Sequence, residues 1–244
     1  MAMEEFIARY YYMGVGVIEF YNRGLKELPE SISILKSLGD VYLDNNELTT
    51  LPESIGDLTR LNILSLNNNQ LSKLPESIGK LVNLKYLYLM DNKLTSLPDS
   101  IGKLVRLEKL YLNVNQLNKL PESIGELVNL KDLRLYHNEL SSLPESIGKL
   151  VKLNVLVLEN NQLRNLPTSI LNIKKSLHLD VSSYEIDNLD QNIEMLIFTK
   201  LKEGITNLPI NLKEVWIQKL SRKMKRIKHK KFYSLPFGCV IKYY

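Results

Sequence analysis

Residues 74–96 read LPESIGKLVNLKYLYLMDNKLTS, and this stretch recurs along the chain with a period of 23 residues. A Leu-Pro pair opens each repeat, and the prolines of successive pairs are 23 residues apart: Pro29, Pro52, Pro75, Pro98, Pro121, Pro144 and Pro167. A fixed period of about 20 to 50 residues indicates a repeat architecture, in which each unit buries its apolar face against its neighbours. The period therefore decides the fold.

Each repeat divides into a strand and a helical turn. Residues 86–90 alternate in character, which predicts a short strand with Leu87 and Leu89 facing the core. Pro75 and the Glu-Ser-Ile-Gly after it suit the start of a short helical turn, because proline is tolerated at a first helical position and acidic residues are favoured near that end. We interpret the glycines of the Gly-Lys pairs as turn glycines rather than a phosphate-binding loop: Gly79, Gly102 and Gly148.

An asparagine follows the strand in six successive repeats: Asn46, Asn69, Asn92, Asn115, Asn138 and Asn161. A side-chain amide both donates and accepts hydrogen bonds, so a column of asparagines can pair the backbone groups that are left where the chain turns away from the sheet. We therefore expect this asparagine column to be structural.

The string L-x-x-L-x-L-x-x-N-x-L identifies the chain as a member of the leucine-rich repeat family; its positions are Leu84, Leu87, Leu89, Asn92 and Leu94. The LPESIGKL segment resembles the 23-residue class of intracellular Ras-pathway scaffolds and scribble- and erbin-type proteins. The resemblance covers at least residues 28–189 and implies an α/β solenoid or horseshoe, with a parallel sheet on the concave side, short helical turns on the convex side, and a surface that binds proteins. The composition and the tail also resemble leucine-rich repeat proteins encoded by large DNA viruses of amoebae.

The ends of the chain depart from the consensus, as expected of a capped solenoid. Residues 1–27 are interpreted as an N-terminal cap and first irregular repeat, in which residues 1–13 cover the coil of Phe20. Residues 28–189 hold the 23-residue repeats. Residues 190–244 are interpreted as shorter irregular repeats, with a period of 19, and a basic C-terminal cap with a last strand near residues 239–241.

Composition favours an intracellular protein. The chain has one cysteine, no Asn-x-Ser/Thr sequon and no apolar stretch near 20 residues, and its first residues, MAMEEF, carry acids where a signal peptide carries basic residues. We therefore expect a cytoplasmic location, with a nuclear one as the alternative if the basic run near the C-terminus is an import signal.

That basic run carries the positive charge of the chain. Residues 219–231 hold eight of the 32 Lys and Arg residues and no acid, so the rest of the chain has 24 basic and 27 acidic residues. This basic run has three explanations: a solvated helix face, a nuclear import signal, or a contact to nucleic acid or acidic membrane. The residues concerned, besides Lys219, are Arg222, Lys223, Lys225, Arg226, Lys228, Lys230 and Lys231.

The outward strand positions form the face that we expect to bind a partner. Tyrosine and arginine are enriched at binding hot spots, and six candidates crowd onto three adjacent coils that span about 10 Å at a strand spacing near 4.8 Å. Tyrosine ladders that only stabilise a sheet are the alternative. Together with one tyrosine from an earlier coil, the predicted partner-binding residues are Tyr42, Tyr86, Tyr88, Met90, Tyr111, Arg134 and Tyr136.

The sequence contains few residues that could form a catalytic or metal site. The three histidines, His137, His178 and His229, lie in separate places, and His178 with Asp180 lacks the third ligand that a metal site needs. We interpret Cys239 as a buried, inert thiol. The sequence therefore predicts no enzyme, no cofactor, no metal and no small-molecule substrate.

Two functions remain open. The first is a non-catalytic protein-interaction module, a scaffold or a competitor of a signalling protein, that binds through the concave face with little sensitivity to salt. The alternative is a nucleic-acid or acidic-membrane surface binder that acts through residues 219–231, whose affinity should fall steeply with salt.

Overall fold

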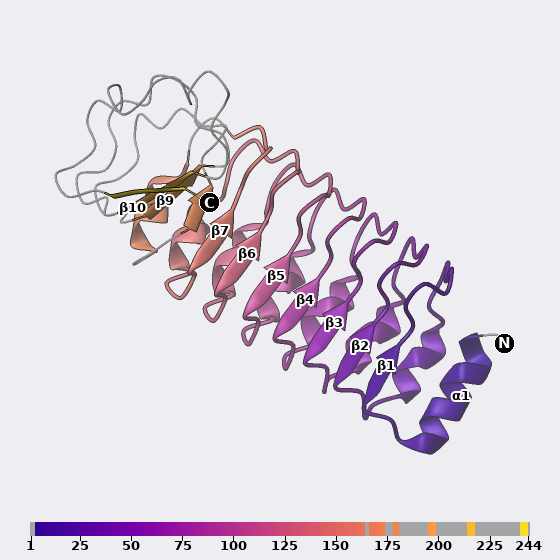
Figure 1. Ribbon diagram of the computed structural model, residues 1–244. Coiled ribbons are helices and arrows are strands. Elements are labelled where there is room, and N and C mark those ends of the chain that lie inside the picture. The colour runs from indigo at the N-terminus through magenta and orange to yellow at the C-terminus, as the bar shows by residue number, and fades with distance from the viewer. Residues whose placement is uncertain are drawn as a thin grey trace.

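The structure is a computed structural model that describes residues 3–163, 166–173, 178–180, 195–198, 214–217 and 240–243. Its strands lie side by side in sequence order in one parallel sheet (Figure 1). The predicted solenoid with a parallel sheet is confirmed. The strands are β1 (Val17–Glu19), β2 (Asp40–Tyr42), β3 (Ile63–Ser65), β4 (Tyr86–Tyr88), β5 (Lys109–Tyr111), β6 (Asp132–Arg134), β7 (Val155–Val157), β8 (His178–Asp180), β9 (Met195–Phe198), β10 (Glu214–Ile217) and β11 (Val240–Tyr243).

Short 3-10 turns line the opposite side of the solenoid (Figure 1). The sequence predicted that proline is the first helical residue of the turn. The backbone of Pro75 is instead extended, with φ −70° and ψ 152°, so proline precedes the turn. The described turns are η1 (Glu30–Ile34), η2 (Glu53–Asp57), η3 (Glu76–Lys80), η4 (Asp99–Lys103), η5 (Glu122–Glu126), η6 (Glu145–Lys149) and η7 (Thr168–Asn172).

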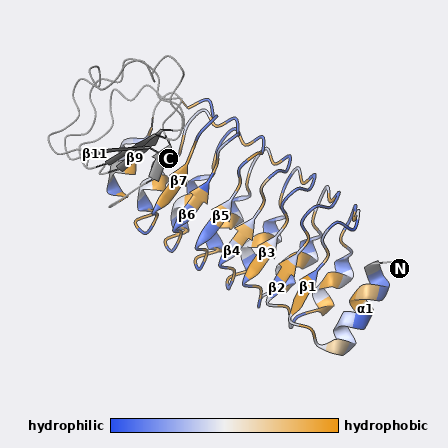
Figure 2. Cartoon of the chain, in the orientation of Figure 1, coloured by the Kyte–Doolittle hydropathy of each residue, from blue (hydrophilic) through white to orange (hydrophobic). Residues whose placement is uncertain are grey.

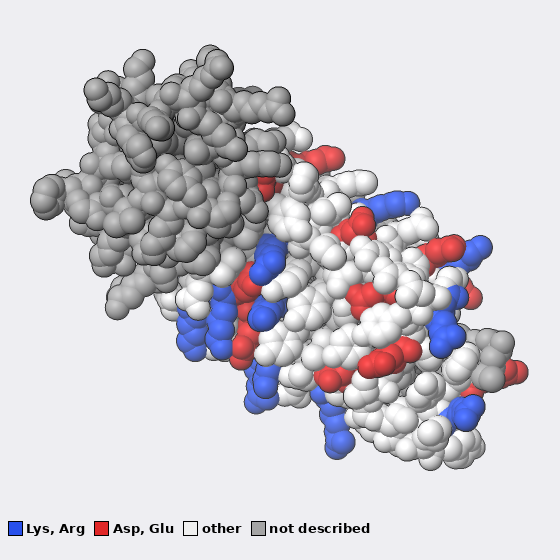
Figure 3. Space-filling view, viewed as in Figure 1, with Lys and Arg blue, Asp and Glu red and all other residues white. Residues whose placement is uncertain are grey.

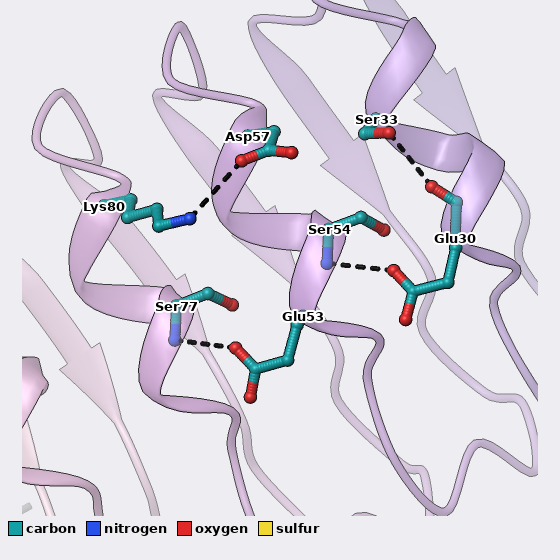
Figure 4. A network of polar contacts seen from close by, with 7 residues as sticks. All are labelled: Glu30, Ser33, Glu53, Ser54, Asp57, Ser77 and Lys80. Carbon is teal, nitrogen blue, oxygen red and sulfur yellow. Dashed lines mark hydrogen bonds and ion pairs between the residues drawn. The ribbon is translucent and has the colours of Figure 1, made fainter.

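Glutamates join successive turns (Figure 4). The Glu53 carboxylate accepts a hydrogen bond of 3.1 Å from the backbone N–H of Ser77 in the next coil, and Glu30 does the same for Ser54. A carboxylate at the start of a helical turn pairs an N–H group that has no partner within the turn. The glutamate after the proline has this inter-coil role at four positions: Glu30, Glu53, Glu122 and Glu145.

The core lies between the sheet and the turns, and apolar residues recur in every described coil (Figure 2). Leu87 and Leu89 are fully buried, as predicted. In the sheet Leu87 lies opposite Leu110, because the register follows the 23-residue period. Each fully buried leucine contributes about 1.5 to 3 kcal/mol of transfer free energy, and it does so only when a neighbouring coil covers it.

The hydrogen bonds of the asparagine side chains confirm the predicted structural role of the asparagine column. The Asn92 side-chain nitrogen donates to the carbonyl oxygens of Leu66 (2.9 Å) and Leu89 (3.2 Å), and its oxygen accepts from the Leu71 N–H (3.0 Å). Leu66 and Leu71 belong to the preceding coil, so each asparagine ties its own coil to the one before it. The first coil has no predecessor, which explains why Arg23 is tolerated at the equivalent position.

Helix α1 (Met3–Met13) closes the N-terminal end (Figure 1). Ile7 is buried, and the rings of Phe6 and Tyr10 contact the ring of Phe20 at 5.5 and 5.7 Å between centroids. Helix α1 therefore packs against the coil of Phe20. Within the described ranges, no helix combines the length and apolar character that crossing a bilayer requires.

Towards the C-terminus, the backbone of β9 pairs with that of β10, with Met195 opposite Glu214. These residues are 19 apart, which is the shorter period seen in the sequence. Strand β11 then pairs with β10 and begins within the range predicted for a last strand. The division of the chain at residues 27 and 189 stays a prediction.

One non-glycine position in each of seven successive coils adopts the left-handed conformation, with φ between 53° and 58°. Asparagine and aspartate tolerate this conformation, whereas a β-branched residue is strained in it. Valine stands at one of these seven positions, three residues after the end of β5. The column consists of Asn22, Asn45, Asn68, Asp91, Val114, His137 and Asn160.

Replacing Asn92 with alanine should lower the free energy of unfolding by about 3 kcal/mol, because two carbonyls and one N–H lose their buried partner. Urea denaturation measures the change. Asn83→Ala is the matched control, since the hydrogen bonds of Asn83 lie at the surface, and it should cost less than 1 kcal/mol, on the order of a single net hydrogen bond. Equal losses would contradict the role of the column.

Gly102→Ala should destabilise the protein by about 2 kcal/mol. A Cβ atom there would lie 2.6 Å from the carbonyl oxygen of Ser123, so two successive 3-10 turns would have to separate. The close approach, and not turn conformation, explains the glycine. In Gly39→Ala the new Cβ would meet the carbonyl oxygen of Gly16 at 3.6 Å, an ordinary contact, so thermal denaturation should show little change.

Val114→Asn should stabilise the protein by about 1 kcal/mol, because asparagine adopts the left-handed conformation at lower cost than valine. Val128→Asn provides the control, since Val128 is similarly exposed and has no positive φ. Chemical denaturation of both variants tests the prediction. A Val114→Asn variant no more stable than the parent chain would show that the strain is relieved elsewhere.

Candidate functional site

The concave face is built from the outward side chains of the strands, as the alternation predicted. In β4 and β5, Tyr86, Tyr88 and Tyr111 are half-buried on this face while the leucines between them are fully buried. The parallel register places Tyr88 directly beside Tyr111, and Tyr111 directly beside Arg134. The solenoid therefore brings together residues that are 23 positions apart in the sequence.

The tyrosines form a continuous ring surface. The rings of Tyr86 and Tyr88 lie nearly parallel, with 8° between their planes and 6.4 Å between centroids. The Tyr88 and Tyr111 rings are 5.0 Å apart and tilted by 53°. Lys109 extends over the Tyr86 ring at 5.7 Å. Such offset and tilted pairs are favourable aromatic geometries, so the rings hold one another in place.

Asp132 holds the next part of the site. Its carboxylate accepts hydrogen bonds from the Arg134 Nε (3.2 Å) and Nη2 (3.1 Å), and from the Tyr111 hydroxyl (2.9 Å). The Arg134 guanidinium lies over the Tyr111 ring, 4.5 Å from its centroid. We call Tyr88, Tyr111, Asp132 and Arg134 the arginine cluster. In it a bidentate ion pair and a cation–π contact fix the guanidinium in one position.

The electrostatics of the cluster favour this arrangement at neutral pH. Burial, the hydrogen bond to Asp132 and the charge of Asp132 together raise the pKa of Tyr111 to about 12. Burial also raises the pKa of Tyr88. Both phenols are therefore neutral donors at physiological pH. The stabilisation that the raised pKa of Tyr111 represents is present below pH 10 and is lost as the pH rises through about 12.

Two other predicted residues border the arginine cluster. Tyr136 lies edge-on to His137, with 5.6 Å between ring centroids. Met90 is half-buried, and its N–H donates to the Asn67 side-chain oxygen at 2.9 Å. Asn113 occupies the equivalent position in the coil between Met90 and Tyr136. It is only 1% exposed, and its side-chain nitrogen has no partner among the described residues. Nothing in the sequence pattern indicates that Asn113 is covered.

Tyr42 belongs to a second aromatic pair. Its ring lies 5.8 Å from that of Tyr21, at the N-terminal end of the face. Ser65, which is 4% exposed, lies in the strand between Tyr42 and Tyr88. Acidic side chains gather over the N-terminal strands on the face seen in Figure 3. The concave face thus has an acidic N-terminal end and an arginine-bearing centre.

The predicted partner-binding residues did not include Asp132 or Tyr21. Asp132 occupies an outward position, yet it is only 8% exposed because Arg134 and Tyr111 lie against it. Tyr21 stands beyond the end of β1, and only the equivalence of its position with Asp44 and Met90 in the 23-residue period could have indicated that it joins the face.

Several predicted features fall outside the described residues. These are the side chains of His178 and Asp180, the thiol of Cys239, and the basic run at residues 219–231. The function assigned to the basic run stays a prediction. In the part of the chain that is described, no three His, Cys, Asp or Glu side chains are grouped so that they could hold a metal ion.

Comparison with known proteins supports the same architecture. A family model described as leucine rich repeat matches residues 59–117 and 105–163. A leucine-rich repeat protein of Leptospira interrogans is 24% identical with a TM-score of 0.63, over 97% of this chain and 79% of that one. The leucine-rich repeat domain of the type III effector XopL is 24% identical with a TM-score of 0.67, over 98% of this chain and 79% of that one. At these identities the likeness shows the fold alone.

A third similar structure is that of PEPR1 with AtPEP1, which is 31% identical with a TM-score of 0.65. The match covers 78% of this chain and 29% of that one. A comparison with curated protein sequences returned no match. The family model, the solved structures and the one-strand coils together support a leucine-rich repeat protein.

Proposed function

We propose that this chain is a non-catalytic interaction module that binds a protein partner through its concave face, as a scaffold or a competitor of a signalling protein. The leucine-rich repeat fold is generally a protein–protein interaction module. The one observation that carries the proposal is the arginine cluster, because it presents hot-spot residue types in a fixed geometry on a half-buried surface.

The fixed geometry matters for affinity. Arginine and tyrosine side chains lose rotamer freedom when a partner binds them, at about 0.5 to 1.5 kcal/mol for each immobilised side chain. Asp132 has already immobilised Arg134 and Tyr111, and Tyr88 rests against Tyr111. The arginine cluster therefore binds a partner with less further loss of entropy than free surface side chains would.

Solved relatives support a peptide or protein ligand. The PEPR1 structure is one with AtPEP1, and the ectodomain of the plant receptor kinase GASSHO1/SCHENGEN3 was solved in complex with CASPARIAN STRIP INTEGRITY FACTOR 2. Both proteins are much longer than this chain, which spans 29% of each. They support the class of partner and leave its identity open.

The test is affinity capture from cell lysate at about 0.3 M salt, where exposed charge contacts are largely screened. The intact chain should retain a protein that the Tyr88→Ala/Tyr111→Ala/Arg134→Ala variant retains at least tenfold less, because hot-spot truncations each cost about 2 kcal/mol or more. Circular dichroism verifies that the variant is folded.

The matched control is Arg9→Ala/Tyr11→Ala/Tyr12→Ala, which likewise removes one arginine and two tyrosines, here from exposed positions of α1. It should retain the partner as the intact chain does. Equal losses in both variants would contradict a concave site. Retention that disappears with salt alone would instead move the function to the basic run at residues 219–231.

A further inference from the structure

The N-terminal end of the concave face holds an aromatic pair that the arginine cluster does not involve. Tyr21 and Tyr42 lie with ring centroids 5.8 Å apart and a plane angle of 36°, and Tyr21 is 38% exposed. Glu19 stands directly beside Tyr42 in the register of β1 and β2. Asp40 occupies the other outward position of β2. The two rings are therefore bordered by carboxylates on the same face.

Asp44 fixes this end of the surface. It is 8% exposed, and its Oδ1 accepts hydrogen bonds from the Ser65 hydroxyl (2.6 Å) and the Asn67 N–H (2.9 Å). Glu19 and Asp40 differ from it, because their carboxylates form no ion pair or hydrogen bond with any residue that the structure describes. Two carboxylates beside two rings are left available to a ligand.

The arginine cluster provides an internal comparison. There a tyrosine ring and a carboxylate, Tyr111 and Asp132, already hold the guanidinium of Arg134. Among the described residues, Lys109 and Arg134 are the cations that lie over tyrosine rings, and neither lies over Tyr21 or Tyr42. The N-terminal pair has the same ring-plus-carboxylate composition without the cation.

The electrostatic environment agrees with this comparison. Burial and the charges of Asp44 and Glu19 raise the pKa of Tyr21, and burial with the charges of Asp40, Glu19 and Asp44 raises the pKa of Tyr42. At Tyr88 and Tyr111, by contrast, Arg134 acts in the opposite direction. The rings of the N-terminal pair are thus surrounded by uncompensated negative charge.

We infer that Tyr21, Tyr42, Glu19 and Asp40 form a binding site for a cationic side chain, a lysine or an arginine, that the protein partner supplies. A cation over a tyrosine ring gains a cation–π contact, and the adjacent carboxylates add ion pairs. The inference rests on the proposed function only in assigning the cation to the partner. The site also sets the direction in which the partner lies along the concave face.

Strand spacing sets where the cation lies in the partner. Three strand steps of about 4.8 Å separate the middle of β1 and β2 from the middle of β4 and β5, which amounts to about 14 Å. An extended peptide covers about 3.3 Å per residue. A linear partner segment should therefore carry its basic residue about four residues from the group that packs on Tyr88 and Tyr111.

The test uses N-acetyl-arginine amide as the probe and the intact chain with ¹³C-labelled tyrosine rings. Nuclear magnetic resonance at constant ionic strength should show the ring signals of Tyr21 and Tyr42 shifting and saturating, with a dissociation constant of about 5 to 50 mM. Tyrosine-to-phenylalanine substitutions assign the signals. N-acetyl-citrulline amide, the neutral isostere, should produce no saturating shift.

The Glu19→Gln/Asp40→Asn variant should bind the arginine probe at least threefold more weakly. Glu27→Gln/Glu139→Gln removes the same charge from exposed positions outside the site and should bind as the intact chain does. Equal shifts with citrulline, or unchanged binding in Glu19→Gln/Asp40→Asn, would overturn the inference. Because the probe assay needs no partner, this result is distinguishable from a failed capture, which would sink the proposed function instead.

Discussion

The hydrogen bonds of the buried asparagine column fix each coil to the one before it, and the rest of the structure depends on them. Asn92 pairs with two carbonyls of its own coil and with one carbonyl and one N–H of the preceding coil. These contacts join the coils at the point where the backbone leaves the sheet. Because a strand has a side-chain period of 2, a slip of one residue would turn the leucines outward and the tyrosines into the core.

Because the register is fixed, residues at equivalent positions of successive repeats form one continuous surface. Residues 23 apart lie side by side, so the outward positions of each strand can vary without disturbing the leucines between them. The outward residues differ in character along the sheet. Carboxylates and two tyrosines lie over β1 and β2, whereas rings and the Arg134–Asp132 pair lie over β4 to β6. The proposed binding function and the cation site both follow from this uneven distribution.

The 23-residue period was sufficient to predict the strands, the turns, the asparagine column and the composition of the concave face, because each depends on backbone periodicity. What it could not predict depends on side-chain contacts between coils. Asp132 stands at an outward position, and only the reach of Arg134 and Tyr111 buries it. Similarly, the need for Gly102 arises from the carbonyl of Ser123 in the next coil, which no local turn signal reveals.

Site-specific photocrosslinking most directly tests the claim that the outward strand residues of the concave face form the binding surface. A benzoylphenylalanine introduced at Tyr86, on the edge of the ring surface, should crosslink to the partner in lysate. The same residue introduced at Lys80, exposed in η3 on the opposite side, should not. Adducts from Lys80 without adducts from Tyr86 would contradict the account, because they would place the partner on the side of the 3-10 turns.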